Sequence, residues 1–512
     1  MEENSTEQLN EIEMMDDEKE RKKTKKYKKK WPCLSFDIVA DDLGDNRTDF
    51  PMSCYLIGGT QAEKATNNEL IVMKLSNLYP IESDGASDSE EDLEENTQNK
   101  EPKFHASAIP HLGIVNRVKI HVRLLYWNEI ITSIIRLRLQ KQKYLESFYT
   151  LKTTVLGQSK VCAAFSSQGK VTLWNLTQAM EEISDMEGRD RIVKRPKERP
   201  FFSFLGHQAE GYALSWSPLK MGKLASGDIR HKIHLWTMAE GGRWVVDEKP
   251  LIGHKDSVED LCWSPVEETM LASCSADHSI KLWDTRSAPS DACVCTVENA
   301  HESHANVISW NKFEPLLVSG GDDSILNVWS LKTMQVVAGL HEESAIYIFF
   351  SYIKPDQIIC YSLKAGTHWI NKYVGDLKVV ADYNYQVYKE PVGRFKQHKA
   401  PITSVEWSPH ETTTMIASGE DNQVTIWDLS LEADSAEDIV DVPQQLLFTH
   451  MGQKEVKEVT AFKKFANLSP KHSSLSEDMG SNHGHVHWHG QIPGFAVTTA
   501  LSGFNVFKPI NL

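Results

Sequence analysis

Long apolar runs are missing from this sequence of 512 residues, because no stretch reaches the 18 residues that a membrane-spanning helix requires. The first residues also lack the consecutive basic and apolar regions of a secretory signal peptide. The eight cysteines include no CxxC pair, and several of them fall in segments that we expect to be core strands. We therefore predict buried, reduced thiols in a reducing compartment, and no membrane association.

Motifs for catalysis and metal binding are scarce. The sequence contains no phosphate-binding loop, no nucleophile elbow and no metalloprotease signature. The segment HGHVHWH (residues 483–489) places four histidines at every second position, so on a strand they would share one face and could bind zinc or nickel. No cysteine or carboxylate completes such a site. We expect a non-catalytic protein without a metal, a cofactor or a small-molecule substrate.

Positive charge is in the minority, and the formal net charge at pH 7 is −16. This balance disfavours direct nucleic-acid binding by the body of the protein and favours basic protein partners. A basic run, ERKKTKKYKKK, ends the first 30 residues. We predict that residues 1–30 form a disordered arm, whose role is nuclear localisation, nucleic-acid contact or solvation alone.

An acidic segment lies at residues 82–95, where eight of the residues are Asp or Glu, including Glu90, Glu91 and Asp92. Almost nothing in it is apolar, so we predict a disordered loop between two strands. One interpretation is a solvated insertion, and the other is a contact for a basic partner protein.

The chain repeats a histidine and tryptophan pattern. His207, His254, His301 and His398 are each followed nine residues later by a tryptophan, and 28 or 29 residues later by another, at positions 236, 283, 329 and 427. The first three copies step by 47 residues, and the best copy, Gly253 to Arg286, opens with Gly-His and closes with Trp-Asp. A repeat of this length and signature predicts an all-β fold, a WD-repeat β-propeller with four strands in each blade.

Each repeat should contain a buried chain of hydrogen bonds. In the best copy Asp277 would accept from the ring of His254, and that ring would bond Ser273, which in turn would bond the indole of Trp283. Asp323 and Trp329 repeat this spacing, as do Asp421 and Trp427, whereas Arg230 stands where the first copy should have its aspartate. We therefore expect an incomplete set in the first copy. This structural interpretation outweighs a catalytic triad.

We expect seven blades when the strand-like segments SCYLIGGTQ and NELIVMKLSNL, near residues 53–78, are counted as strands B and C of one blade. Residues 31–110 would form a docking segment and ring-closing strands, and residues 111–512 the propeller. Irregular insertions near 122–152, 335–388 and 460–486 interrupt it, as genuine loops or as translated intron. The second could instead be a degenerate blade, and the third splits the expected first strand of the last blade.

The channel mouth of the propeller is the candidate binding surface. Positions three and five residues after each repeat histidine, and the residue before the turn aspartate, should face it. Five of these fourteen residues are acidic and none is Lys or Arg, which favours steering of a basic segment, although the acidity could only mirror the whole chain. The partner-binding residues that we predict there are Glu210, Tyr212, Glu259, Asn306, Asp322, Glu420 and Glu455.

Several strings outside the repeat signature resemble one family, the glutamate-rich WD-repeat proteins. These are WPCLSFDIVADDLGDNRTDFP, CYLIGGTQAE, VNRVKI, VPQQLLFTH and HGQIPGFAVTTALSGF, together with the repeats around SVEDLCWSP and SCSADHSIKLWD. The family is related to the WD-repeat histone-binding chaperones, which share a WPxL(S/T) segment at the equivalent of Trp31 to Ser35.

The resemblance implies a seven-bladed ring and a nuclear, nucleolar ribosome-biogenesis factor. It also implies that the chain, as a monomer, chaperones a basic large-subunit ribosomal protein on its way to pre-ribosomal particles and binds core histones. Trp31, Leu34 and Phe36 would anchor the docking segment. Family members carry an amphipathic helix before that segment, whereas this chain has KKTKKYKKK, so a client groove built on that helix is not predicted.

Two alternatives stay open from the sequence. One is a histone chaperone in chromatin assembly. The other is a substrate-receptor subunit of a ubiquitin ligase, because WDTR (residues 283–286) places an arginine after a Trp-Asp pair, although its spacing differs from the usual WDxR signature.

Overall fold

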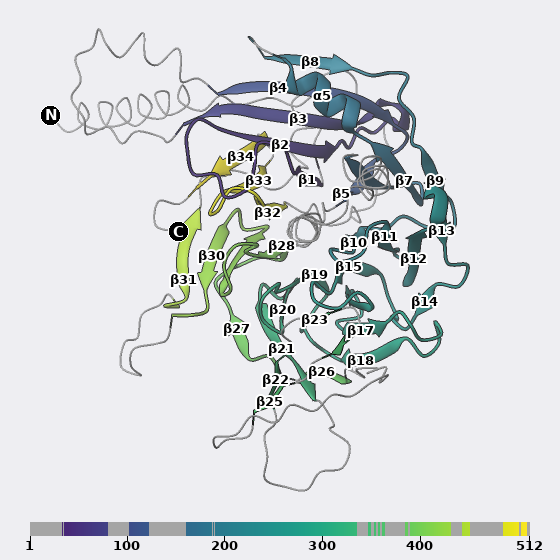
Figure 1. The fold of residues 1–512 in the computed structure, drawn as a ribbon, viewed down its shortest axis with the longest axis vertical. Helices are drawn as coiled ribbons and strands as arrows, with labels where there is room; N and C mark the ends of the chain where they lie inside the picture. Colours follow the sequence, from purple (N-terminus) through teal and green to yellow (C-terminus); the bar gives the residue numbers. More distant parts are fainter. Residues whose placement is uncertain are drawn as a thin grey trace, which may run out of the picture. The chain divides into compact units, whose positions relative to one another are not determined.

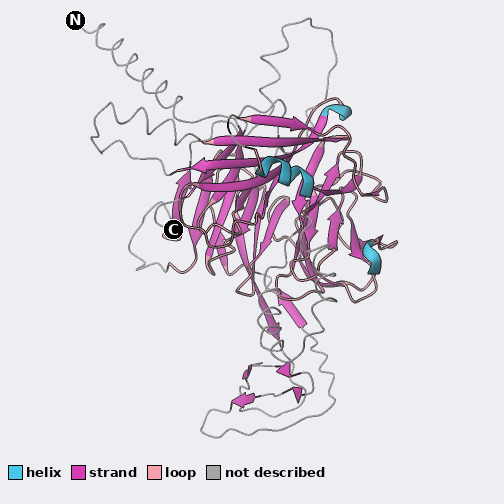
Figure 2. Cartoon of the chain, turned by 45° about the horizontal axis from the view of Figure 1, so that its top comes forward, coloured by secondary structure: helices cyan, strands magenta, loops and turns pink. Residues whose placement is uncertain are grey.

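A computed structural model describes the chain in several ranges. These are residues 33, 35–79, 102–121, 160–186, 188, 190–334, 390–431, 443–450, 485–500 and 503–508, with short strands between 347 and 387. The chain divides into two units, one made of Met1–Ser330 with Tyr388–Leu512 and the other of Leu331–Val387. Helices are few and short, and strands dominate (Figure 2). Among the described residues, no helix has the length and apolar character of a membrane span.

The first unit is a seven-bladed propeller, as predicted (Figure 1). Its sheets, numbered here as blades 1 to 7 in chain order, start from an innermost strand. Blade 1 contains β1 (Phe36–Val39), β2 (Met52–Gly59), β3 (Asn68–Leu78), β4 (Lys103–His111) and, parallel to β4, β8 (Arg191–Lys194). Blade 2 contains β5 (Val115–Ile120), β6 (Val161–Ser166), β7 (Lys170–Asn175) and β9 (Phe202–Phe204).

Blades 3 to 5 carry the first three full repeats. Blade 3 contains β10 (Ala213–Trp216), β11 (Lys223–Gly227) and β12 (Lys232–Met238), with β13 (Trp244–Val246) and β14 (Leu251–Ile252) both paired to β12. Blade 4 contains β15 (Val258–Trp263), β16 (Met270–Ser275), β17 (Ile280–Asp284) and β18 (Cys293–Val297). Blade 5 contains β19 (Ala305–Trp310), β20 (Leu316–Gly321), β21 (Leu326–Met334) and β27 (Gly393–Phe395).

Blades 6 and 7 complete the ring. Blade 6 contains β28 (Ile402–Trp407), β29 (Thr414–Gly419), β30 (Val424–Asp428) and β31 (Leu446–His450). Blade 7 contains β32 (Val486–Trp488), β33 (Ala496–Ala500) and β34 (Gly503–Phe507). Short 3-10 turns, η1 (Ala65–Asn67) and η2 (Glu240–Gly242), lie in blades 1 and 3.

Side chains join blade 1 to blade 7. Phe36 in β1 is fully buried and meets the rings of Phe504 and His487 edge-on, at centroid distances of 5.4 and 5.0 Å. Gln491 accepts from the backbone N–H of Asp41 at 2.8 Å and donates to the carbonyl of Asp41 at 3.1 Å. Phe36 is thus the structural anchor that we predicted, while Trp31 and Leu34 lie outside the described residues. The N-terminal strands form a blade of their own, and no described strand of theirs hydrogen-bonds to the C-terminal sheet.

The predicted hydrogen-bond chain is present in blades 4 and 5. The ring of His254 lies 3.0 Å from Asp277 and 2.6 Å from the Ser273 hydroxyl, which accepts from the Trp283 indole at 2.8 Å. In blade 5 the same four places are taken by His301, Asp323, Ser319 and Trp329. A single hydroxyl therefore serves both a histidine ring and an indole.

Blade 3 corrects the expectation of an incomplete set. His207 lies 2.8 Å from both Asp228 and the hydroxyl of Ser226. Asp228 stands two residues before Arg230, and its second oxygen accepts from the backbone N–H groups of Arg230 and Lys232. The turn thus places an earlier aspartate against the histidine, so the set is complete without an acid at position 230.

Blades 2 and 6 supply the hydroxyl from the neighbouring strand. Thr425 accepts from the Trp427 indole at 2.9 Å and lies 3.0 Å from the ring of His398, which also contacts Asp421. Thr425 is paired across the sheet with Ala417, the place of serine in blades 3 to 5. In blade 2 Thr172, paired with Ala164, accepts from the Trp174 indole and approaches His111 at 3.5 Å.

The other repeat tryptophan connects neighbouring blades. Trp263 in blade 4 donates its indole N–H to the carbonyl of Ser215 in blade 3 at 3.1 Å. Trp407 in blade 6 makes the same bond to Ser309 in blade 5, also at 3.1 Å. The two tryptophan positions of the repeat therefore have different tasks, one within a blade and one between blades.

The insertion near 335–388 is not a degenerate blade, because seven blades are present without it. The second unit, Leu331–Val387, contains the last residues of β21, paired with β26 (Asn384–Val387). It also contains two short hairpins, β22 (Tyr347–Phe349) with β25 (Tyr361–Leu363), and β23 (Ile353–Lys354) with β24 (Gln357–Ile358). Residues 122–152 lie outside the described part, as does most of 460–486; β32, which begins at Val486, is the innermost strand of blade 7.

One helix was not predicted. Between β7 and β9 the chain leaves blade 2 and forms α5 (Thr177–Ser184), then β8 on blade 1. Ala179, Met180 and Ile183 of α5 are buried in a core that includes Tyr55 and Val72 of blade 1. This excursion therefore fastens blade 2 to blade 1.

Removing the shared hydroxyl of blade 6 should weaken the fold. Thr425→Val keeps the side-chain shape but leaves the Trp427 indole and the His398 ring without their oxygen, so we expect a loss of roughly 1–3 kcal/mol in the free energy of unfolding. Ala417→Ser in the same chain should recover most of that loss, because blades 3 to 5 carry their hydroxyl there. Urea unfolding followed by tryptophan fluorescence measures both effects. Thr412→Val, at an exposed threonine, is the control; a Thr425→Val variant no less stable than this control would contradict the role of the hydroxyl.

Candidate functional site

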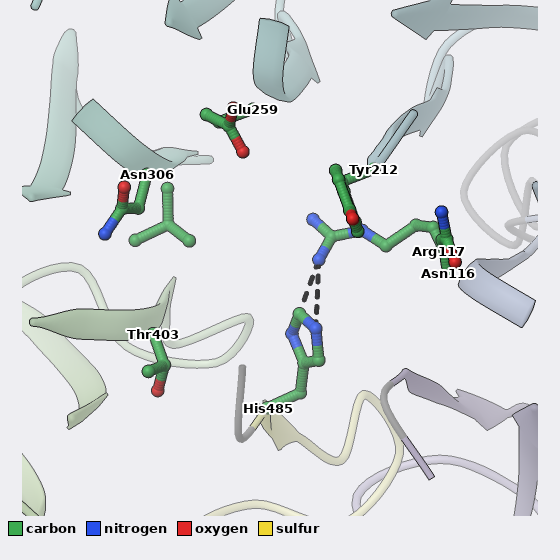
Figure 3. A pocket seen from close by; sticks show the side chains of 8 residues that line it. Asn116, Arg117, Tyr212, Glu259, Asn306, Thr403 and His485 are labelled. Carbon is green, nitrogen blue, oxygen red and sulfur yellow. Dashed lines mark hydrogen bonds between the residues drawn. The ribbon is translucent and has the colours of Figure 1, made fainter. Parts of the chain in front are cut away.

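The innermost strands bring side chains from several blades to one opening at the channel mouth. Tyr212, Glu259, Asn306 and Thr403, each five residues after a repeat histidine, line it (Figure 3). Asn116, Arg117, Val307 and His485 complete the lining. The structure therefore brings together the four described residues of this offset. The predicted Glu455 lies outside the described residues, as do Glu90, Glu91 and Asp92.

A β-bulge explains why this offset faces the channel. The register of the two inner strands shifts between Val258 and Asp260 in blade 4, and between Ala305 and Val307 in blade 5. Blades 2 and 6 have the same shift. A bulge leaves one residue unpaired and turns its side chain away from the ladder. The unpaired residues are Asn116, Glu259, Asn306 and Thr403.

The other two predicted offsets lie side by side above the opening. In four consecutive blades the residue before the turn donates its backbone N–H to the carbonyl of the residue three after the histidine, at 2.9–3.0 Å. The pairs are Ile229 with Glu210, Ala276 with Ser257, Asp322 with His304, and Glu420 with Pro401. Carboxylates of Glu210, Asp322 and Glu420 therefore occur at equivalent places on blades 3, 5 and 6.

Two amides orient the rim carboxylates. Asn116 donates to the carboxylate of Glu210 at 2.9 Å, and Asn306 donates to that of Asp322 at 2.7 Å. Both donors are uncharged, so these contacts position the carboxylates without cancelling their charge. His304 also lies 3.3 Å from Asp322. The rim carboxylates are thus held in place and stay available to a cationic partner.

Glu259 is the carboxyl group that extends furthest into the opening. Burial raises its pKa, and the nearby Asp322 and Asp256 raise it further, while Ser257 and His304 act in the opposite direction. Burial and the neighbouring Glu210 and Glu259 raise the pKa of Tyr212 to about 12. Within the described ranges Glu259 forms no salt bridge. An incoming cation would therefore stabilise its ionised form.

The sequence analysis missed the basic side of the opening. Arg117 is buried, forms a 2.6 Å ion pair with Asp260 and lies 3.2 Å from Nε2 of His485 (Figure 3). The expectation of a one-signed surface therefore holds for the fourteen predicted positions but not for the opening itself. Asn116 could have been found, since it stands five residues after His111; that histidine lacks the glycine of the signature.

The opening offers little to a small molecule or a metal. Its space is about 280 Å³, part of it open solvent, whereas small-molecule sites usually span about 300–1,000 Å³. No group of three His, Cys, Asp or Glu side chains in the described part of the chain could hold a metal ion. Of the histidine tract, His487 contacts Glu406 at 2.9 Å, and His489 accepts from the backbone of Gln491. These contacts suit a surface that binds a protein.

Fold and mouth define a WD-repeat β-propeller protein. The family model for the WD domain, G-beta repeat, matches residues 247–284, 292–330 and 389–428. The model described as histone-binding protein RBBP4, or its equivalent in the CAF1 complex, matches residues 26–79.

The chain resembles three proteins over 94% of its length. It is 34% identical to Protein HEAT STRESS TOLERANT DWD 1 of Arabidopsis thaliana, covering 85% of that protein. It is 33% identical to Ribosome assembly protein rrb1 of Schizosaccharomyces pombe and 32% identical to Glutamate-rich WD repeat-containing protein 1 of Dictyostelium discoideum, covering 78% of each. The chain belongs to the glutamate-rich WD-repeat protein family.

Glu259→Gln should stabilise the protein at neutral pH. A carboxyl whose pKa is raised by folding lowers stability as the pH rises from its unfolded pKa through its folded pKa, and the penalty then persists. The amide carries no such penalty, so the variant should exceed the wild type in unfolding temperature near pH 7, by a margin that shrinks in acid. Calorimetry across this pH range, with Glu314→Gln as the exposed control, measures the margin. A margin that does not change with pH would contradict the burial of this carboxyl.

Proposed function

We propose that this chain is a non-catalytic ribosome-assembly chaperone. It would hold a basic protein of the large ribosomal subunit in the nucleus and nucleolus until that protein joins a pre-ribosomal particle. The similarity to a relative named as a ribosome assembly protein supports the process. The chemistry of the channel mouth supports the charge of the partner.

The observation that carries the proposal is the convergence of carboxylates from neighbouring blades. Glu210, Asp322 and Glu420 lie at equivalent rim positions, and Glu259 extends into the opening. Charges of one sign around a concave surface attract a partner of opposite sign and orient it on approach. Arg117, already paired with Asp260, sits below this rim. A lysine- or arginine-rich segment is the partner that the rim would select.

The acidic segment 82–95 would add a second contact. It lies in the chain between β3 and β4 of blade 1, outside the described residues, and it includes Glu90, Glu91 and Asp92. A flexible polyanion close to the mouth would raise the local concentration of a basic partner. Both contacts are exposed, so the association should weaken with salt, since the screening length is about 8–10 Å at physiological ionic strength.

A histone chaperone is the second candidate. The match of residues 26–79 to the histone-binding family model favours it, as does a relative named Histone acetyltransferase type B subunit 2 from Candida glabrata, which is 23% identical over 31% of this chain. Core histones are also basic, so the same rim would suit them. For the ubiquitin-ligase alternative, the guanidinium of Arg286 is exposed but is held by Asp284 at 2.6 Å.

Neutralising the rim should weaken binding of a basic partner. In the triple variant Glu210→Gln/Glu259→Gln/Glu420→Gln, three attractive charges are removed, each worth about 0.2–1 kcal/mol at an exposed site, so we expect a loss of about 3- to 100-fold in affinity. The loss should shrink at high salt. Calorimetric titration with a purified basic large-subunit ribosomal protein, and separately with core histones, measures it.

The matched control changes the same charge elsewhere. Glu240→Gln/Asp291→Asn/Glu314→Gln removes three exposed carboxylates away from the mouth. Equal affinities for the two triple variants would contradict a role for the rim. Tighter binding of histones than of the ribosomal protein to the wild type would favour the second candidate.

A further inference from the structure

A run of positive charge lies on the outer edge of this acidic protein. Residues 191–199, RIVKRPKER, contain five cations and one acid in a chain with a net charge of −16. The first four residues are β8, which ends the strand order of blade 1, and the rest lead towards β9 of blade 2. Figure 1 shows β8 on the outer rim, beyond β4. We call residues 191–199 the basic strip.

The fold holds the basic strip in one conformation. β8 pairs with β4 from His105 to Ala108, and the backbone N–H of Arg195 extends the ladder at 2.8 Å. The guanidinium of Arg195 bonds Glu182 at 2.9 Å and Glu198 at 2.6 Å, which ties the turn to α5. Arg195 is therefore structural, and its neighbours are presented on a rigid support.

The remaining cations are exposed. Arg191 and Lys197 form no ion pair with any residue that the structure describes, and Arg199 bonds only backbone carbonyls. Lys194 pairs with Glu69, yet its side chain is 70% exposed. Two residues after Arg199 stands Phe201, which is 48% exposed. The strip thus combines cations that can bind a ligand with an exposed aromatic ring.

General protection of sheet edges does not account for this charge. Lysines on an outer strand do prevent pairing with other chains. However, the outer strands of the other blades manage without them: β9, β13, β14, β18 and β34 contain no Lys or Arg, β31 contains none, and β27 contains only Arg394. The charge of β8 therefore has another cause.

We propose that the basic strip binds the phosphate backbone of single-stranded RNA. Surfaces that bind single strands without sequence preference combine cations along the backbone with an aromatic ring on which a base stacks. Arg191, Lys194 and Lys197 supply the cations, and Phe201 supplies the ring. The mouth lies on the innermost strands and the strip on an outermost one, so this site does not depend on the proposed function of the mouth.

The test measures RNA affinity of the full chain at several salt concentrations. Fluorescence anisotropy with a labelled 12-nucleotide oligouridylate compares the wild type with Arg191→Gln/Lys197→Gln. Removing one cation that neutralises a phosphate should reduce the slope of log affinity against log salt by about 0.7, so we expect a decrease of about 1.4 for the pair. Phe201→Ala should weaken binding and leave the slope unchanged. The basic arm before residue 31 is present in every variant, so its contribution cancels in the comparison.

The control pair is Arg243→Gln/Lys249→Gln, two exposed cations in blade 3 that should leave both quantities unchanged. Equal slopes for the strip variant and the wild type would overturn the proposal. A labelled 12-residue polyglutamate that binds the wild type more tightly than the RNA does, and loses affinity in the strip variant, would also overturn it, because the occupant would then be an acidic protein segment. Unchanged circular dichroism confirms that the variants fold.

Discussion

One hydroxyl group, shared between a histidine ring and an indole, is the constraint on which each blade depends. Its position fixes the histidine, and the histidine fixes the loop that enters the innermost strand. The aspartate on the other ring nitrogen completes the chain: burial alone would raise the pKa of Asp277, but the hydrogen bonds from His254 and Ser279 outweigh burial and lower it. A lowered carboxyl pKa contributes stability at neutral pH that is lost as the pH falls through the folded pKa. Protonation of these aspartates should thus accompany unfolding in acid.

The same histidine sets the geometry of the mouth. Five residues after it the inner strand bulges, and the unpaired side chain faces the channel, so one repeated local structure produces a ring of functional positions. Indole bonds between blades, such as Trp407 to Ser309, and the contacts of Phe36 and Gln491 between the first and last blades keep those positions in a common frame. Carboxylates far apart in the sequence can therefore act on one partner, which is what our proposed chaperone role requires.

Spacing alone predicted the all-β propeller, its seven blades and the offset of the mouth residues, because these follow from a repeat with a fixed period. It could not predict Asp228, since the turn in blade 3 shifts the aspartate by two residues, nor Thr425, since recognising it requires the pairing of Thr425 with Ala417. Arg117 was missed because His111 lacks the repeat signature. α5 was missed because eight residues give too short a pattern, and its burial depends on blade 1.

The central claim is that a basic partner sits on the acidic mouth, and a photocrosslink tests it most directly. A benzophenone amino acid placed at Tyr212 would report contact at the mouth, and one at Phe313, in the turn at the opposite end of β19, would report contact at the other face. With a purified basic large-subunit ribosomal protein bound, the account predicts crosslinked peptides rich in lysine and arginine from position 212 and none from position 313. Crosslinks from position 313 alone would contradict it.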